Sequence, residues 1–306
     1  MDLTAIRGGS SAYTMLPDGS RASFGGDEYV FVELDEAMSL HATLRVQSIA
    51  ARIGALGLPG VVDIAPANSS YLIRLDPDQV DPRRALTTIT ALHADGRTTA
   101  SGIRTEILDV PVLYDDPWSL EVCMRSRDGH QSATETDIQF TARINGFASV
   151  DELVAAHSSA PFIVTFPCFK PGNAESYQLV PRERQIQAPK YLTPRTETPA
   201  RAVAHGGAFT VIYPSSGVGG YQLLGRSAIP VVDLGQTTRE FRRSPVLTPI
   251  STLLQFRPVD REEYDDVRRL MDADQYVVRR APVEFSLSDF EADPVGYARS
   301  LRGLLS

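Results

Sequence analysis

The sequence predicts an α+β protein in which an N-terminal α/β domain precedes an all-β barrel or sandwich. Between residues 29 and 113, strand-like and helix-like segments follow in the order β-α-β-β-α-β, which is the split-βαβ order of ferredoxin-like domains. Between residues 161 and 258, short apolar runs are separated by Gly and Pro, a spacing typical of barrels and sandwiches. A polar, helical stretch lies between the two parts.

Capping and strand signals define the α/β domain. Ser39 is a typical N-cap for the first helix, and Gly57 supplies the left-handed residue that ends it. Asp81 is placed to cap the second helix, with Pro82 at the first helical position, where the missing amide hydrogen costs nothing. In order, we expect a strand at 29–34, a helix from 39 to 57, strands at 61–64 and 70–75, a helix beginning at 81 and a long strand at 103–114.

The rest of the chain is assigned from composition and from further capping signals. Residues 1–28 are rich in Gly and Ser and are predicted to be a lead-in segment. Residues 114–260 are predicted to hold a helical insertion, with a capping box of Ser149 and Glu152, followed by the β-barrel. Residues 261–306 are expected to form a helix and an arm that packs on the domain or on a partner.

Charge and composition disfavour several classes of protein. The 306 residues carry 30 basic and 38 acidic side chains, and the net charge of -8 disfavours binding to nucleic acid or to an anionic membrane surface. There is no run of about 18 apolar residues, so no transmembrane helix is expected. The first residues lack the features of a secretory signal, and the two cysteines lack CxxC spacing. We therefore expect a cytoplasmic protein.

Lysine is nearly absent, which limits the chemistry that this chain can perform. Lys170 and Lys190 are its only lysines, and neither lies in the GxxxxGK[ST] pattern of a phosphate-binding loop. Neither lies between methionines, as a biotin-carrying lysine typically does. The HExxH pattern of zinc enzymes and the GxSxG pattern of nucleophilic serines are also absent. The chain alone is therefore not expected to bind ATP, a metal or a tethered cofactor.

Seven segments together resemble a known family. They are FGGDEYVFVEL, LPGVVDIAP, SYLIRLDP, VPVLYDD, INGFASVDELVAAH, APKYLTPR and GGYQLLGRS. These segments are similar to the carboxyltransferase region of urea carboxylase, within the group called allophanate hydrolase subunit 1, and they span roughly residues 24–275. The same group holds the B component of ATP-dependent 5-oxoprolinase and the Kip-type inhibitors of a sporulation kinase.

The resemblance implies an N-terminal ferredoxin-like domain and a C-terminal cyclophilin-like barrel. It also implies a second, homologous carboxyltransferase half, of the allophanate hydrolase subunit 2 type, whose barrel would pair with this one to build the active site. Carboxylated biotin would come from a partner with biotin carboxylase and carrier parts, which would also use the ATP. In the lactam-opening branch the partner would be a LamB-type subunit. The substrate is expected to be a small amide, urea or lactam.

Two stretches that match the family, APKYLTPR and GGYQLLGR, are predicted to line the active site. Lys190 and Arg195 could hold the transferred carboxylate, and Gln222 could hydrogen-bond an amide or ureido group. In segments that depart from the family pattern, Lys170 could point into the cleft and His205 could act as a base. The expected substrate-binding residues are Tyr191, Gly206, Gly207, Gly219, Gly220, Tyr221, Arg226 and Asn173.

Each of these assignments has a structural alternative. The KYLTPR segment can be an exposed hairpin arm, and Arg226 can pair with an acidic neighbour such as Asp233. Lys170 can equally be an ordinary surface lysine at the end of a strand.

Three functions are compatible with the sequence. The leading hypothesis is one half of the carboxyltransferase of a biotin-dependent, urea-carboxylase-like enzyme, which would be inactive alone and would pass a carboxyl group to an amide or urea nitrogen. The first alternative is the B component of an ATP-dependent, 5-oxoprolinase-type lactamase. The second alternative is a non-catalytic inhibitor of a histidine kinase, which would not need the polar residues that gather in the barrel segments.

Overall fold

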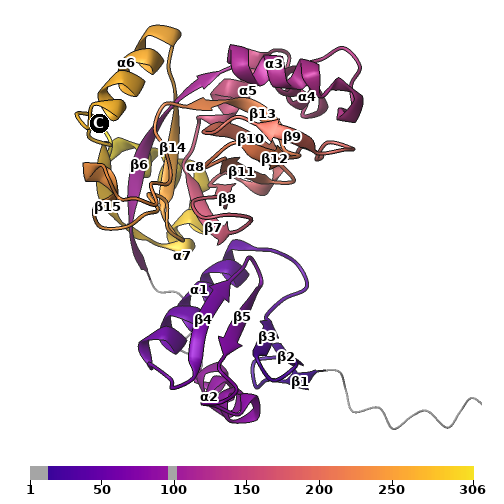
Figure 1. Cartoon of the computed structure of the whole chain (residues 1–306), viewed down its shortest axis with the longest axis vertical. Coiled ribbons are helices and arrows are strands. Elements are labelled where there is room, and N and C mark those ends of the chain that lie inside the picture. The colour runs from indigo at the N-terminus through magenta and orange to yellow at the C-terminus, as the bar shows by residue number, and fades with distance from the viewer. Residues whose placement is uncertain (1–12, 96–101) are drawn as a thin grey trace, which may run out of the picture. The chain divides into compact units, whose positions relative to one another are not determined.

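The computed structural model describes residues 13–95 and 102–306 (Figure 1). Its internal contacts divide the chain into two compact units, residues 1–101 and residues 102–306. Within the described ranges, every helix is too short or too polar to cross a membrane.

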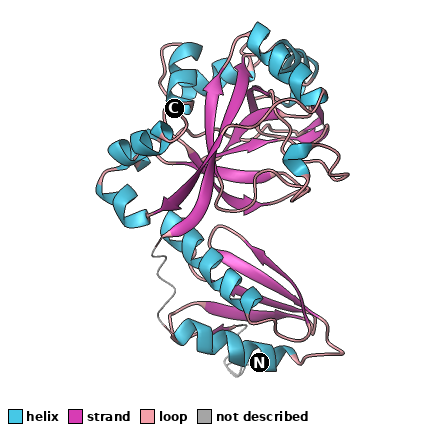
Figure 2. Cartoon of the chain, turned by 90° about the vertical axis from the view of Figure 1, so that its left-hand side faces the viewer, coloured by secondary structure: helices cyan, strands magenta, loops and turns pink. Residues whose placement is uncertain are grey.

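The first unit is a five-stranded antiparallel sheet with two helices on one face (Figure 2). Its strands follow the order β1-β2-β3-β5-β4. Alternate residues of β3 and β5 are buried, among them Val30, Val32 and Tyr71, and they pack against apolar side chains of both helices. The elements are β1 (Thr14–Met15), β2 (Arg21–Gly25), β3 (Tyr29–Glu33), α1 (Leu40–Ala55), β4 (Val61–Pro66), β5 (Ser70–Leu75) and α2 (Pro82–Ala94).

The capping residues expected from the sequence begin both helices. The Ser39 hydroxyl accepts a hydrogen bond from the Ala42 amide at 3.0 Å. Asp81 accepts one from a first-turn amide at 2.7 Å, and Pro82 opens α2. Gly57, which follows α1, has a φ of 55°, in the left-handed region that favours glycine.

The strand content of this unit differs from the prediction. The long strand expected to complete the ferredoxin-like order lies in the second unit as β6 (Ile103–Tyr114). The place beside β3 that the split-βαβ order would give to that strand is occupied by β2. Of the predicted lead-in segment, residues 13–28 contribute β1 and β2, whereas residues 1–12 lie outside the described residues.

The second unit is built on a closed β-barrel of seven strands (Figure 1). The strands run in the order β13-β10-β11-β8-β7-β14-β6, and pairing of β13 with β6 closes the ring. The barrel strands are β6, β7 (Phe162–Pro167), β8 (Ala174–Gln178), β10 (Ala202–Gly206), β11 (Phe209–Ile212), β13 (Gln222–Ser227) and β14 (Leu253–Pro258).

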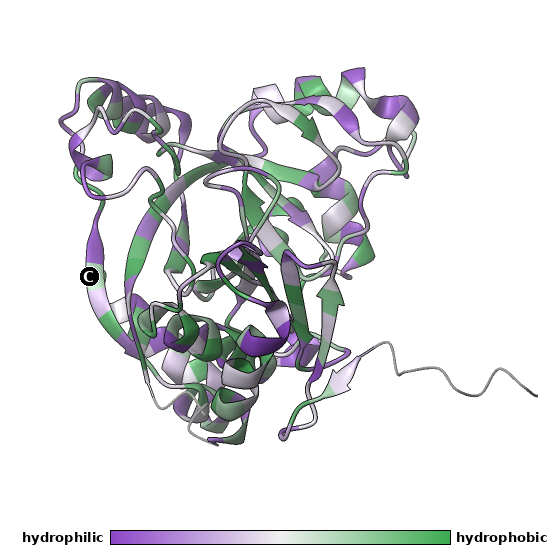
Figure 3. Cartoon of the chain, turned by 60° about the horizontal axis from the view of Figure 1, so that its bottom comes forward, coloured by the Kyte–Doolittle hydropathy of each residue, from purple (hydrophilic) through white to green (hydrophobic). Residues whose placement is uncertain are grey.

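The burial of β6 on both faces explains why the sequence predicts the wrong sheet for this strand. Residues 107–112 of this strand are all buried, and Asp109 is the one charged residue among them. A strand covered on both faces is a continuous apolar run, and such a run does not indicate which sheet it joins. Figure 3 shows hydrophobic residues along the barrel strands, and Val110, Phe162 and Phe256 belong to one core cluster.

Helices and short strands surround the barrel (Figure 2). The C-terminal arm packs back on its own unit, because β15 pairs antiparallel with β6 along its whole length. The surrounding elements are α3 (Pro117–Arg125), η2 (Arg127–Gly129), α4 (Asp137–Ile144), α5 (Val150–His157), η3 (Arg182–Arg184), β9 (Arg195–Thr198), β12 (Gly217–Gly219), η4 (Arg239–Phe241), α6 (Arg261–Asp272), β15 (Arg280–Phe285), α7 (Leu287–Ala292) and α8 (Pro294–Gly303).

A chain of hydrogen bonds crosses the buried core of the barrel. It runs from the Tyr114 hydroxyl through His157, Thr210 and His205 to the carbonyl of Ile186, with each step at 2.8–2.9 Å. Because the Ile186 carbonyl can only accept, Nε2 of His205 carries the hydrogen and its Nδ1 accepts from Thr210. Burial lowers the pKa of both imidazoles, so both are neutral near neutral pH.

The buried His205 in this row of hydrogen bonds predicts that the protein loses stability in mild acid. Burial lowers the pKa of His205 to about 4, whereas the unfolded chain titrates near 6.5. Between pH 6.5 and pH 4, His205 binds a proton in the unfolded state but not in the folded state. The free energy of unfolding therefore falls as the pH drops through this range, by about 3 kcal/mol for His205. Urea unfolding across this range should show a shallower pH slope for His205→Gln, and an unchanged slope for His41→Gln, whose side chain is exposed.

Candidate functional site

A cleft of about 540 Å³ lies on the outer face of the barrel. Its walls come from the end of β7, the loop that follows it, β8, β11, the segment before β9, and β12 with the residues that follow it. The lining residues are Phe166, Cys168, Phe169, Asn173, Glu175, Lys190, Tyr191, Leu192, Pro194, Val211, Tyr213, Val218, Gly219, Gly220 and Tyr221.

The charged groups of the cleft meet at Tyr221. The Tyr221 hydroxyl donates to Glu175 Oε1 at 2.6 Å, and the Lys190 Nζ lies 5.1 Å from the centre of the same ring. Lys190 is exposed, and its ammonium makes no hydrogen bond or ion pair with any described residue. One aromatic side chain thus contacts a solvent-facing cation through its ring and a carboxylate through its hydroxyl, and all three residues line the same cleft.

The inner wall of the cleft is tightly packed and neutral. Burial raises the pKa of the Cys168 thiol, so it stays protonated near neutral pH and is a poor nucleophile. The Asn173 amide donates to Cys168 Sγ at 3.5 Å. Gly219 is required in this wall, because a Cβ there would lie 2.4 Å from Thr198 Oγ1 and 2.6 Å from the Tyr213 hydroxyl oxygen.

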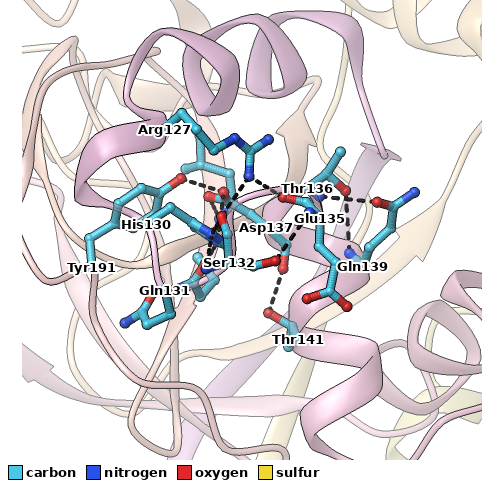
Figure 4. Close-up of polar contacts among 12 residues, drawn as sticks. Arg127, His130, Gln131, Ser132, Glu135, Thr136, Asp137, Gln139, Thr141 and Tyr191 are labelled. Atoms are coloured by element: carbon cyan, nitrogen blue, oxygen red, sulfur yellow. Dashed lines mark hydrogen bonds and ion pairs between the residues drawn. The ribbon is translucent and has the colours of Figure 1, made fainter.

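A buried polar network behind the cleft fixes the segment that carries Lys190 (Figure 4). Asp137, at the start of α4, accepts hydrogen bonds from the Tyr191 hydroxyl and from the Leu223 amide, the latter at 2.7 Å. Its carboxylate also lies 3.5 Å from Nη1 of Arg195, whose guanidinium stacks 4.4 Å from the centre of the Tyr191 ring. The helical insertion therefore determines where Tyr191 and Arg195 lie.

The other half of the network holds the backbone on either side of Lys190. The Gln222 amide donates to the Pro189 carbonyl at 2.9 Å and to Gln131 at 3.1 Å. Gln131 in turn donates to the Lys190 carbonyl. His130 is 3.0 Å from the Gln222 side-chain oxygen. These contacts fix the backbone at Lys190, and none of them involves its ammonium.

Six of the predicted site residues line the cleft: Asn173, Lys190, Tyr191, Gly219, Gly220 and Tyr221. Three residues that matter here were missed by the sequence analysis, namely His130, Asp137 and Glu175. His130 follows the η2 turn, in a polar stretch with no ligand or catalytic pattern. No pattern in the sequence distinguishes Asp137 or Glu175 from surface carboxylates.

Two of the predicted catalytic residues, His205 and Gln222, are buried and do not line the cleft. His205 is on β10 with its side chain in the barrel core, where both ring nitrogens are hydrogen-bonded and burial disfavours its protonation. It is therefore not a base for this cleft. Gln222 is fully buried, and its amide group is saturated by His130, Gln131 and Pro189. It positions the cleft wall rather than a substrate.

The remaining predicted residues also lie outside the cleft lining. Lys170 donates to the Ser215 hydroxyl at 3.0 Å and so ties two loops together. Arg195 is 2% exposed and donates to the Tyr221 carbonyl at 2.7 Å. Arg226 stacks on Trp118 rather than pairing with Asp233.

The predicted glycine pair has a structural role. Gly206 packs against the Tyr221 ring, where a Cβ would come within 2.5 Å, and Gly207 has a φ of 59° in a bridge to Ala188. Among the described residues, no group of three or more His, Cys, Asp or Glu side chains is placed to hold a metal ion.

Sequence comparisons relate the chain to two kinds of protein. It is 27% identical over 246 residues to a urea amidolyase of Lachancea kluyveri, which covers 78% of this chain and 13% of that protein. It is 27% identical over 210 residues to the B component of 5-oxoprolinase from Escherichia coli O157:H7, which covers 68% of this chain and 84% of that component. The chain thus spans only a small part of the amidolyase and most of the 5-oxoprolinase component.

A solved structure and a family profile extend this relationship. The crystal structure of the K. lactis urea amidolyase matches 96% of this chain and 18% of its own chain, with a TM-score of 0.80 at 21% identity, which is a likeness of fold. The profile of the carboxyltransferase domain, subdomain C and D, matches residues 20–241. The chain therefore belongs to the carboxyltransferase domain family and represents its subdomains C and D.

Proposed function

We propose that this chain is one half of a biotin-dependent carboxyltransferase and that the cleft beside Lys190 is its contribution to the active site. The observation that carries the proposal is the exposed Lys190 ammonium over the Tyr221 ring, with Glu175 bound to the hydroxyl of the same side chain. An ammonium at the mouth of a small cleft is suited to hold a carboxylate. A carboxylate and phenols inside it are suited to hold the N–H and carbonyl groups of an amide or urea.

The cleft fits a reactive group delivered from outside, because Lys190 and Leu192 are exposed at its mouth. Carboxylated biotin on a partner would supply the carboxyl group: its bond to a ureido nitrogen breaks, a bond to the substrate nitrogen forms, and the proton of that nitrogen passes to biotin. In this arrangement Lys190 neutralises the carboxylate that moves. Tyr221 and Glu175 orient the accepting nitrogen, and the apolar wall at Phe166 and Val211 excludes water.

The rim of the cleft supports a site shared with a second polypeptide. Phe169, Leu192 and Val218 are 67%, 75% and 53% exposed, and all three border the opening. Large apolar side chains gathered at one opening are typical of a surface that a partner covers. We propose that the homologous second carboxyltransferase half covers it and that this chain is inactive alone.

A second candidate function is that of a lactamase component related to the B component of 5-oxoprolinase. The observation that favours it is the extent of the match, because this chain aligns with 84% of the E. coli protein. In that case the same cleft would hold a lactam, and the ATP-dependent step would belong to a partner.

Reconstitution distinguishes these functions. We expect a complex of this chain with the second carboxyltransferase half and a biotin-carrying carboxylase to consume ATP in a urea- or amide-dependent manner, and each protein alone to be inactive. Consumption that depends on 5-oxoproline and not on urea would select the lactamase. Turnover by this chain alone would contradict both, and tight binding to a histidine kinase without turnover would select the inhibitor.

A further inference from the structure

Four arginines gather around two aromatic rings near the end of β13 that lies away from Tyr221. The guanidiniums of Arg226 and Arg261 lie 4.8 and 4.9 Å from the centre of the Trp118 ring. That ring packs against Tyr264 with the ring centres 5.6 Å apart.

The other two arginines are held by hydrogen bonds to Tyr264 and to backbone carbonyls. Nη2 of Arg201 donates to the Tyr264 hydroxyl at 3.2 Å, and Nε of Arg201 donates to the Ser227 carbonyl at 3.2 Å. Arg268 donates to the Ala228 carbonyl at 3.1 Å. These contacts, made by α3, β13 and α6, hold the guanidiniums close together, and none of the four arginines lines the cleft.

This cluster has more positive charge than its carboxylates offset. Arg268 pairs with Asp272 at 2.5 Å and Arg261 with Asp265 at 2.6 Å. In the described part of the chain, neither Arg201 nor Arg226 has a carboxylate within ion-pairing distance, although the protein as a whole carries a net charge of -8.

Three further features bear on the energy of this arrangement in the absence of a counter-ion. Burial lowers the pKa of Arg268, and repulsion from Arg201 and Arg226 adds to this effect. Asp116, a buried carboxyl that caps α3, attracts Arg226 electrostatically but does not come within ion-pairing distance of it, and burial raises its pKa. Arg201 also has a φ of 66°, a left-handed backbone that costs energy for a residue with a side chain.

We propose that Arg201, Arg226 and Arg268 form a binding site for a phosphate group. Nε of Arg226 is used by the Ala200 carbonyl at 3.0 Å, which leaves its two terminal nitrogens available as a fork. A guanidinium fork braced on an aromatic ring suits bidentate contacts to a tetrahedral oxyanion. With three guanidiniums in one cluster, a doubly charged phosphate is preferred over a singly charged carboxylate. The site is independent of the cleft and of the carboxyltransferase reaction.

Calorimetric titration of the full chain with inorganic phosphate, at constant ionic strength, tests this site. Wild-type protein is expected to bind one phosphate, and Arg226→Gln and Arg201→Gln are each expected to weaken binding at least tenfold. Arg226→Lys keeps the charge but loses the fork, and it should give an intermediate affinity. The matched control is Arg269→Gln, because Arg269 is on the same helix as Arg268 but is exposed and paired with Asp266.

The outcomes distinguish a specific phosphate site from non-specific attraction of anions to positive charge. Phosphate should raise the melting temperature of the wild type and of Arg269→Gln, and should leave that of Arg226→Gln unchanged. The proposal is overturned if phosphate does not bind, if Arg269→Gln weakens binding as much as Arg226→Gln, or if acetate binds as tightly as phosphate. If Arg226→Gln is poorly folded, the Arg201→Gln and Arg226→Lys variants decide the question.

Discussion

Replacing Lys190 with Ala is expected to lower kcat/KM of the reconstituted complex by roughly 10²–10³-fold, the range seen when one preorganised electrostatic contact to a developing charge is removed. The ammonium is exposed beside the Tyr221 ring and makes no hydrogen bond or ion pair with any described residue, so we expect its loss to leave the fold unaffected. Steady-state kinetics measure the effect, and gel filtration checks that the complex still assembles.

The chain provides its own control for this experiment. Lys170→Ala removes the only other lysine, whose ammonium is bound to Ser215 and Ser216 outside the cleft lining. We expect this variant to keep turnover within a few-fold of the wild type and to lose a little stability. Equal losses in the two variants, or full activity of Lys190→Ala, would remove Lys190 from the mechanism.

Replacing Asp137 with Ala is expected to lower the free energy of unfolding by about 3–5 kcal/mol, the cost of leaving one member of a buried ion pair alone. The Arg195 guanidinium is 3.5 Å from this carboxylate and has no other ion-pair partner in residues 13–95 and 102–306. The Tyr191 hydroxyl and the Leu223 amide would lose their acceptor as well. Urea unfolding followed by the fluorescence of the single tryptophan, Trp118, measures this loss.

Two companion variants make the result specific to the network. Asp128→Ala removes an exposed carboxylate from the neighbouring η2 turn and should change the stability by less than about 0.5 kcal/mol. Asp137→Asn keeps an oxygen for Tyr191 and should lie between the two. If Asp137→Ala behaves like Asp128→Ala, the network does not determine the position of the Lys190 segment.

Local features of the fold were predictable because local rules determine them. Ser39, Asp81 and Gly57 begin or end helices where the sequence indicates, since capping depends on a few neighbouring residues. The assignment of β6 failed because pairing partners are chosen by distant segments. In the structure β6 pairs with β13, β14 and β15, all more than a hundred residues later in the chain.

The site was predictable to the extent that it lies on contiguous sequence. Lys190, Tyr191 and Tyr221 line the cleft as expected, because the segments APKYL and GGYQ each contribute neighbouring residues. His205 was misplaced because both faces of β10 are covered, so alternation along this strand does not reveal which face reaches solvent. Asp137 reaches the site only through tertiary packing of α4, and no local pattern indicates that.

Because the two lysines have different surroundings, their amines should differ in reactivity toward a chemical label. An amine-directed cross-linker used at limiting dose will modify the side chain of Lys190 before that of Lys170, which is tethered between loops. A photoreactive label introduced in this way reports, by mass spectrometry, which polypeptide covers the opening when extracts or purified candidates are added.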